Sequence, residues 1–198
     1  QSGRRQRQMC IRDSNKGKGV MIGKLDNIEP RVVTVIGAGV AGTQSISKAL
    51  DNNAFVKVLD TKKSKLQKLE SKFGSNNIEY ILSTSDSVQS AINESDMVIG
   101  SVYVVGKEAP KVVFKDMLKS MNPGTVMVDV SIDQGGCFET SRPTTHDNPT
   151  FVENDIVHYC VTNMPGAVPL TATQALNKVT LKYCLLYTSP SPRDVSRS

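Results

Sequence analysis

Three glycines with the spacing G-x-G-x-x-G could hold a diphosphate group. Gly37, Gly39 and Gly42 occur in the hexapeptide GAGVAG. Between a strand and a helix, the first glycine permits a tight turn, the second lets the backbone approach a ligand, and the third lets the helix pack closely on the strand. A phosphate would then lie at the positive N-terminus of the helix. The spacing alone is weak evidence, because glycines also serve ordinary turns.

An acidic residue further along the chain completes the pattern of a dinucleotide site. Asp60 ends the segment AFVKVLD, about 20 residues after the glycine turn. A carboxylate at this position would accept hydrogen bonds from the adenosine ribose and repel a 2′-phosphate, which favours NAD over NADP. Lys62, Lys63 and Lys65 follow it and could accommodate a phosphate, so NADP stays open. The alternative for Asp60 is a solvated loop acid.

The elements around these residues have the order that such a site requires. The chain has 198 residues, 38% of them hydrophobic, which is enough for one sizeable core. Strands are expected at 32–36, 54–60, 78–82, 96–102, 125–130 and 157–161. Helices are expected at about 40–50 and 63–73, from about 86, at 114–121 and from 171. Strands alternating with helices predict an α/β fold with a doubly wound parallel sheet.

The positive charge of the chain is concentrated near its ends. Of the net charge of +5, residues 1–13 contribute +3 and residues 184–198 contribute +1. Both segments match translations of a transposon-based sequencing adapter, in MCIRD and in CLLYTSPSPRD. We therefore expect 1–13 and 184–198 to be adapter-like, non-native tails rather than nucleic-acid-binding arms, with native sequence at about 14–183.

The remaining composition argues against several classes of protein. Four cysteines lie far apart without a CxxC pair, so neither a metal site nor a disulfide framework is indicated. Cys137 and Cys160 are interpreted as small apolar residues. No stretch approaches the roughly 18 continuous apolar residues of a membrane helix, and no signal peptide is evident. A cytoplasmic protein without membrane or nucleic-acid partners is expected.

One segment that follows a predicted strand carries a candidate catalytic carboxylate. In a doubly wound sheet, ligands lie beyond the carboxyl ends of the strands. The segment VSIDQGGCFETSRPTTH follows the strand at 125–130 and places Asp133 before two glycines, where backbone can approach a ligand. Asp133 could act on a substrate or could simply cap the glycine loop, and the spacing leaves both open.

Four stretches together resemble the family that alanine dehydrogenase shares with pyridine nucleotide transhydrogenase. They are GKGV, VIGAGVAG, VDVSIDQGGCFETSRPTTHDNP and HYCVTNMPGAVP, and the resemblance covers residues 16–183. The third and fourth stretches are closer to the alanine dehydrogenase branch. The resemblance implies a Rossmann-type NAD-binding domain at 14–170 and, at 171–183, the start of a return segment toward a substrate domain.

The activity that the resemblance implies is the reversible, NAD-dependent oxidative deamination of L-alanine to pyruvate and ammonia. It further implies that Asp133 assists proton transfer and that the protein is a homo-oligomer, often a hexamer. The family's substrate domain has no counterpart in this sequence, so this chain alone is expected to be inactive. A stand-alone NAD-binding regulatory module and a domain like the transhydrogenase α-subunit remain as alternatives.

The family's cofactor contacts fall on segments that follow predicted strands. The resemblance places them at Val40, Ala41, Asp60, Lys65, Ser83, Val102, Tyr103, Val130, Ser131, Ile132, Asp133, Arg142, Val161, Thr162, Asn163 and Met164, in addition to the three motif glycines. Val102 and Val130 would be buried apolar residues whatever the function, and Lys65 could be a solvated helix charge. His146 and His158 are expected in a loop and on the sheet surface, rather than as catalytic acids.

Overall fold

The computed structural model describes residues 17–24 and 28–188 of the 198-residue chain. Its contacts divide the chain into two units, with the boundary between Thr162 and Asn163. The first unit contains the sheet and its covering helices, and the second contains the C-terminal helix. The expected tail at 1–13 lies outside the described residues, and so do residues 189–198 of the expected tail at 184–198, so the non-native origin of both tails stays a prediction.

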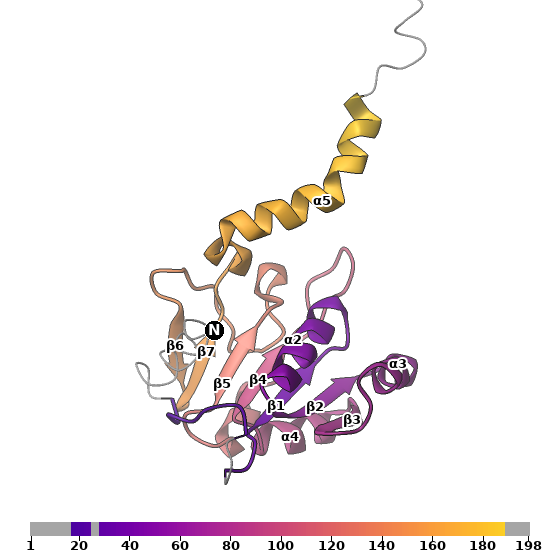
Figure 1. Ribbon diagram of the computed structural model, residues 1–198. Helices are drawn as coiled ribbons and strands as arrows, with labels where there is room; N and C mark the ends of the chain where they lie inside the picture. Colours follow the sequence, from indigo (N-terminus) through magenta and orange to yellow (C-terminus); the bar gives the residue numbers. More distant parts are fainter. Residues whose placement is uncertain (1–16, 25–27, 189–198) are drawn as a thin grey trace, which may run out of the picture. The chain divides into compact units, whose positions relative to one another are not determined.

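The described residues of the first unit form a seven-stranded, mostly parallel sheet (Figure 1). Its strands are β1 (Val32–Ile36), β2 (Phe55–Asp60), β3 (Ile78–Leu82), β4 (Met97–Gly100), β5 (Val126–Asp129), β6 (Thr150–Glu153) and β7 (Ile156–Tyr159). Their order in the sheet is β3-β2-β1-β4-β5-β7-β6, and only β6 is antiparallel to its neighbour. The order reverses direction between β1 and β4, which makes this point the topological switch of the sheet.

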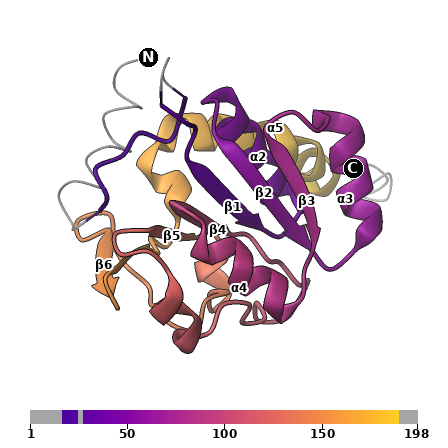
Figure 2. The same cartoon turned by 90° about the horizontal axis from the view of Figure 1, so that it is seen from below.

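Helices cover both faces of the sheet (Figure 2). Helices α2 (Val40–Asp51) and α3 (Lys63–Phe73) pack on one face, where their buried side chains form one apolar core with β1 and β2. Helix α4 (Ser85–Asn93) and the 3-10 helix η1 (Lys115–Ser120) contribute to a second core on the other face, with β4 and β5. The expected doubly wound α/β fold is therefore confirmed, and burial on both faces explains the continuous apolar runs of the central strands.

The structure differs from the sequence-based expectations in two elements, one between β4 and β5 and one before β7. Residues 115–120 form a 3-10 helix rather than an α-helix. Strand β6 was not predicted; it forms a hairpin with β7 through a two-residue turn at Asn154 and Asp155, both with positive φ (50° and 58°). Such a turn matches the right-handed twist of paired strands, and Asn and Asp tolerate its backbone angles.

The second unit contains the short 3-10 helix η3 (Met164–Ala167) and helix α5 (Pro169–Thr188). The predicted helix from 171 is confirmed, and α5 continues past residue 183 without a break. Within the described ranges, no helix combines the length and apolar character that crossing a membrane would require.

Candidate functional site

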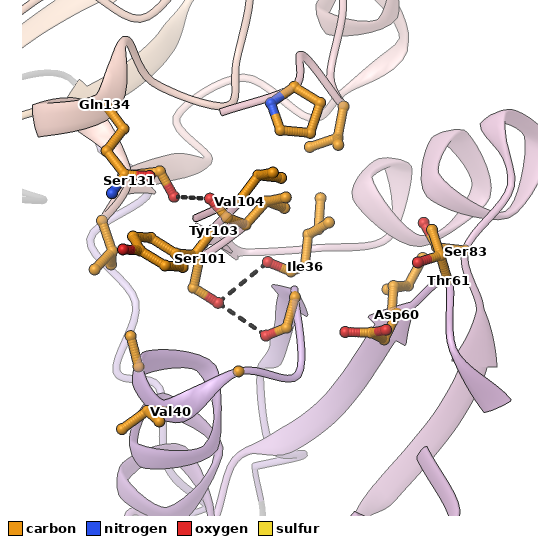
Figure 3. Close-up of a pocket in the computed structure, with 18 of the residues that line it drawn as sticks. Ile36, Val40, Asp60, Thr61, Ser83, Ser101, Tyr103, Val104, Ser131 and Gln134 are labelled. Atoms are coloured by element: carbon orange, nitrogen blue, oxygen red, sulfur yellow. Dashed lines mark hydrogen bonds between the residues drawn. The ribbon is translucent and has the colours of Figure 1, made fainter. Parts of the chain in front are cut away.

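A cavity of about 1000 Å³ lies beyond the carboxyl ends of the strands, at the switch point (Figure 3). It is lined by the β1–α2 turn, by the end of β2, and by the segments that follow β3, β4 and β5. Asp60, Thr61 and Ser83 lie at one side of the view, and Ser131 and Gln134 lie at the other (Figure 3). The position and size are those of a nucleotide-binding cleft in an open α/β sheet.

The three motif glycines are required for three different reasons. Gly37 has φ +103°, and a side chain there would approach the Ser101 carbonyl oxygen within 2.6 Å. A Cβ on Gly42 would collide with the Gly37 carbonyl oxygen, so this glycine lets α2 pack against the turn. Gly39 has no protein atom within 4 Å of the position of a Cβ, and it lines the cavity. The open space at Gly39 is therefore the space that a ligand would use.

The N-terminus of α2 opens into this cavity. Gly39 is its N-cap residue and provides no side-chain cap, and the first turn carries no acidic residue. Gly39, Val40 and Ala41 all line the cavity. First-turn amides have no acceptor within their own helix, and the helix dipole favours negative charge at this end. The turn can therefore bind a phosphate or diphosphate group.

Ser101, which the sequence did not single out, fixes the shape of the turn. Its amide donates to the Ile36 carbonyl oxygen at 2.8 Å, and its hydroxyl lies 2.9 Å from the Gly37 carbonyl oxygen, to which it donates (Figure 3). These bonds join the segment after β4 to the turn after β1. The only sequence signal for Ser101 was its place at the carboxyl end of the strand predicted at 96–102.

Asp60 is a buried, hydrogen-bonded carboxylate at the end of β2. It is 7% exposed, and its Oδ2 accepts from the Ala38 amide at 2.9 Å and from Lys65 Nζ at 3.2 Å. Its Oδ1 accepts from the Lys62 amide at 2.9 Å. Burial raises the pKa of Asp60, but the two amides and the Lys65 ammonium outweigh it and leave the pKa below its usual value. Lys65 is thus an ion-pair partner of Asp60 as well as a cavity residue.

The segments after β4 and β5 form the opposite end of the cavity. Val102, Tyr103, Val130, Ser131 and Asp133 line it there. The Ser131 hydroxyl donates to the Val102 carbonyl oxygen at 2.7 Å, which connects the two segments (Figure 3). Tyr103 is 64% exposed, so its ring is available to a ligand at this end.

A buried carboxylate beneath this end organises the loop that carries Asp133. Asp129 is fully buried at the end of β5 and accepts hydrogen bonds from the amides of Ser131 (3.0 Å) and Cys137 (2.8 Å). It also accepts from the Phe138 amide and the Ser141 hydroxyl. With the Cys137 thiol at 3.5 Å, five donor groups from residues 131–141 converge on one side chain, which holds this loop in place.

A lysine holds the same loop from outside. Lys111 Nζ donates to the carbonyl oxygens of Gly135 (2.6 Å) and Gly136 (2.7 Å). Both glycines have positive φ, 86° and 73°, which side-chain-bearing residues rarely adopt. Neither Asp129 nor Lys111 was among the residues predicted for the site, because each acts through backbone groups of other segments.

Several predicted contact residues do not line the cavity. Ile132 and Val161 are buried in the protein, and Gly42 packs against the turn. The Arg142 guanidinium lies 4.1 Å from the centroid of the Phe151 ring. Thr162 is also outside the cavity lining, and Asn163 and Met164 belong to the second unit. A cofactor contact at these positions stays a prediction.

The expected surface position of His158 is wrong. The side chain is fully buried, stacks on Phe151 and lies 2.8 Å from the Thr140 hydroxyl through Nε2. Its Nδ1 lies 3.1 Å from the Ile156 carbonyl oxygen, so Nδ1 is the protonated donor. Burial is the main cause of the lowered pKa of His158. The unpredicted strand β6 supplies Phe151 and thereby covers this histidine.

His146, Cys137 and Cys160 are as expected. His146 is exposed in the loop before β6. Cys137 and Cys160 are fully buried free thiols. Burial raises the pKa of Cys137, and it raises that of Cys160 to about 11. Both behave as small apolar residues rather than as nucleophiles.

Comparison with known proteins identifies related sequences and structures. The family described as "Alanine dehydrogenase/PNT, C-terminal domain" matches residues 8–196. An alanine dehydrogenase of Halomonas elongata is 48% identical over 167 residues, which are 84% of this chain and 45% of that protein. A solved L-alanine dehydrogenase matches 92% of this chain and 50% of its own, with TM-score 0.85 and 41% identity.

A transhydrogenase from Sinorhizobium meliloti is also similar in structure. It has TM-score 0.71 and 26% identity, and the match covers 83% of this chain and 48% of that one. The chain spans about half the length of the curated relatives it matches.

Proposed function

Because the chain belongs to the family of alanine dehydrogenase and PNT C-terminal domains, we propose that it binds the cofactor of an NAD-dependent alanine dehydrogenase. The reaction is the reversible oxidative deamination of L-alanine to pyruvate and ammonia. The single observation that carries the proposal is the cavity at the switch point, with the glycine turn and Asp60 on one side and Asp133 on the other. The activity belongs to the complete protein, of which this chain corresponds to about half.

The residues on the glycine-turn side fit a dinucleotide. The open N-terminus of α2, with Gly39, Val40 and Ala41, would bind the diphosphate, since a Cβ at Gly39 would meet no protein atom. The ionised Asp60 would accept hydrogen bonds from the ribose hydroxyls and disfavour a 2′-phosphate. Ser83 would lie at the adenine. Lys65 already pairs with Asp60, which reduces the positive charge it could offer to a 2′-phosphate and supports NAD over NADP.

The residues at the other end fit the reacting groups. When bound there, the nicotinamide ring accepts or donates the hydride of the reaction. Asp133 would give a proton to the substrate or take one from it, on a loop that Asp129 and Lys111 hold in one conformation. Val102, Tyr103 and Val130 provide a largely apolar wall against which the nicotinamide ring would pack.

The alanine dehydrogenase branch is favoured over the transhydrogenase branch. The solved L-alanine dehydrogenase has the higher identity, 41% against 26%, and the higher TM-score, 0.85 against 0.71. The curated relative from Halomonas elongata is also an alanine dehydrogenase. A stand-alone regulatory module has no separate observation in its favour.

Two measurements test this proposal. In the first, the chain is titrated with NADH and with NADPH, and binding is followed by the fluorescence of the reduced nicotinamide. We expect saturable binding that is tighter for NADH. In the second, NADH formation is followed with L-alanine and NAD. We expect no turnover by this chain alone and turnover by the complete protein; absence of binding, or a preference for NADPH, would contradict the proposal.

A further inference from the structure

A side chain beside the candidate catalytic carboxylate has an unpartnered oxygen. Gln134 Oε1 is buried and has no hydrogen-bond donor, and it is the only such buried side-chain oxygen or nitrogen among the residues that the structure describes. A buried acceptor without a donor costs free energy relative to one that is paired. Native proteins contain few such groups, and a catalytic role is one of the explanations for those that occur. Gln134 therefore needs an explanation that the protein's own contacts do not give.

The side chain stands at the wall of the proposed nucleotide cavity. Gln134 lines it together with Ser131 and Asp133, and Figure 3 places it on the opposite side from Asp60 and Ser83. Apolar residues form much of the surrounding wall, among them Val102 and Val112. Since Asp60 marks the ribose side in the proposed function, Gln134 lies at the end that takes the nicotinamide.

The backbone of Gln134 is fixed on both sides. Its amide donates to the Ser131 carbonyl oxygen at 2.9 Å, and its carbonyl oxygen accepts from the Ala109 amide at 2.9 Å. The carbonyl oxygens of the next two glycines are held by Lys111. Only the side chain is left to adjust, and its terminal torsion is soft. Because no donor holds Oε1, rotating it toward the cavity breaks no hydrogen bond of that oxygen.

We propose that Gln134 Oε1 accepts a hydrogen bond from the carboxamide NH₂ of the nicotinamide ring and so fixes the orientation of that ring. The inference rests on the proposed function. The Gln134 oxygen requires an N–H donor at this end of the cavity. The amino group of the substrate could also supply that donor. The carboxamide is favoured because it belongs to the ligand that the cavity holds along its whole length, from Asp60 to Gln134. Gln134 would then select the ring face presented to the substrate.

The test compares three ligands on the unmodified chain and on Gln134→Met, in the absence of alanine and ammonia. NADH carries the carboxamide, the reduced 3-acetylpyridine analogue replaces NH₂ with a methyl group, and ADP-ribose lacks the ring. Methionine keeps the length of the side chain and removes the strong acceptor. Gln67→Met, at an exposed position of α3, is the matched control. Binding of the dinucleotides is followed by fluorescence, and that of ADP-ribose by calorimetry.

We expect Gln134→Met to weaken NADH binding about fivefold, the effect of one lost hydrogen bond. Binding of the acetylpyridine analogue and of ADP-ribose should not change, and Gln67→Met should match the unmodified chain with all three. Unchanged NADH binding, or an equal loss with all three ligands, would overturn the assignment. A loss that appears only when the same titration is repeated with alanine added would assign the contact to the substrate amine instead. If the unmodified chain binds not even ADP-ribose, the proposed function itself fails.

Discussion

Asp60 Oδ2 accepts a hydrogen bond from the Ala38 amide at 2.9 Å, which ties the carboxyl end of β2 to the glycine turn after β1. The same carboxylate accepts from the Lys62 amide and from Lys65. One side chain therefore sets the distance between the diphosphate turn and the proposed ribose site. Its negative charge is maintained by these donors, which lower its pKa.

Replacing Asp60 with alanine should weaken NADH binding by about 1–3 kcal/mol, the effect of losing hydrogen bonds to a charged group. NADPH should lose less, because the repulsion of its 2′-phosphate disappears at the same time. Fluorescence titration with both nucleotides measures the two effects. Asp51→Ala, at the exposed end of α2, is the matched control and should change neither. A Kd for NADH that does not change would remove Asp60 from the site.

The variants Gly42→Ala and Gly39→Ala should change two different properties, the stability of the chain and its affinity for NADH. At Gly42 the methyl group collides with the Gly37 carbonyl oxygen, so we expect a loss of unfolding free energy of about 1–3 kcal/mol. At Gly39 the methyl group meets no protein atom within 4 Å, and the backbone has an ordinary φ of −80°. Urea unfolding of the Gly39→Ala variant should match the unmodified chain, while its NADH affinity falls.

This pair separates packing from ligand contact within one motif. If Gly39→Ala binds NADH as tightly as the unmodified chain, the diphosphate does not use this turn. If Gly42→Ala unfolds at the same urea concentration as the unmodified chain, α2 has room to move away from the turn, and the close packing is not required.

The local patterns of the sequence predicted the part of the fold that holds the glycine turn. The β-branched run before Gly37, the helical pattern after it and the segment that ends at Asp60 are all short-range signals. The structure confirms them as β1, α2 and β2. Strand β6 was missed because its sequence TFVE has polar residues at both ends and no continuous apolar run, so its only evidence was the Asn154–Asp155 turn. His158 was misplaced for the same reason, since Phe151 of β6 covers it.

The supporting residues of the site could not be predicted from spacing. The Ser101 hydroxyl bonds to the Gly37 carbonyl 64 positions away in the sequence, and Lys111 Nζ bonds to glycine carbonyls 24 and 25 positions away. Their partners are backbone atoms, which every residue carries, so no sequence pattern distinguishes them. The cofactor contacts predicted at Arg142 and at residues 161–164 rest on the family resemblance alone, and none of these residues lines the cavity.

Stability should fall as the pH drops below the ordinary pKa of histidine, and His158 should be a main cause. Burial holds its pKa below the usual value of about 6.5, so the unfolded chain takes up the proton first. The stability that the neutral imidazole contributes is therefore complete above about pH 6.5 and is lost as the pH falls toward the folded-state pKa. Urea unfolding at pH 7.5, 6.5 and 5.5 measures this slope.

The variant His158→Gln, which cannot titrate, is the control for this slope. It is expected to be less stable at pH 7.5, because the contacts with Thr140 and Phe151 change. Its unfolding free energy should nevertheless depend less on pH between 7.5 and 5.5. An equal slope in both proteins would show that other groups cause the loss of stability.

The two buried thiols should resist alkylation as long as the chain is folded. The raised pKa of Cys160, about 11, leaves on the order of one thiolate in a thousand at pH 8, and Cys137 is further suppressed by burial and by the nearby Asp129 carboxylate. Iodoacetamide at pH 8, followed by mass spectrometry of the peptides, should leave both residues unmodified in the native chain and label both in 8 M urea. Rapid labelling of Cys137 in the native chain would mean that the Asp129-centred loop opens in solution, because the Cys137 amide is bonded to Asp129. The proposal that the loop of Asp133 is held in one conformation would then be wrong.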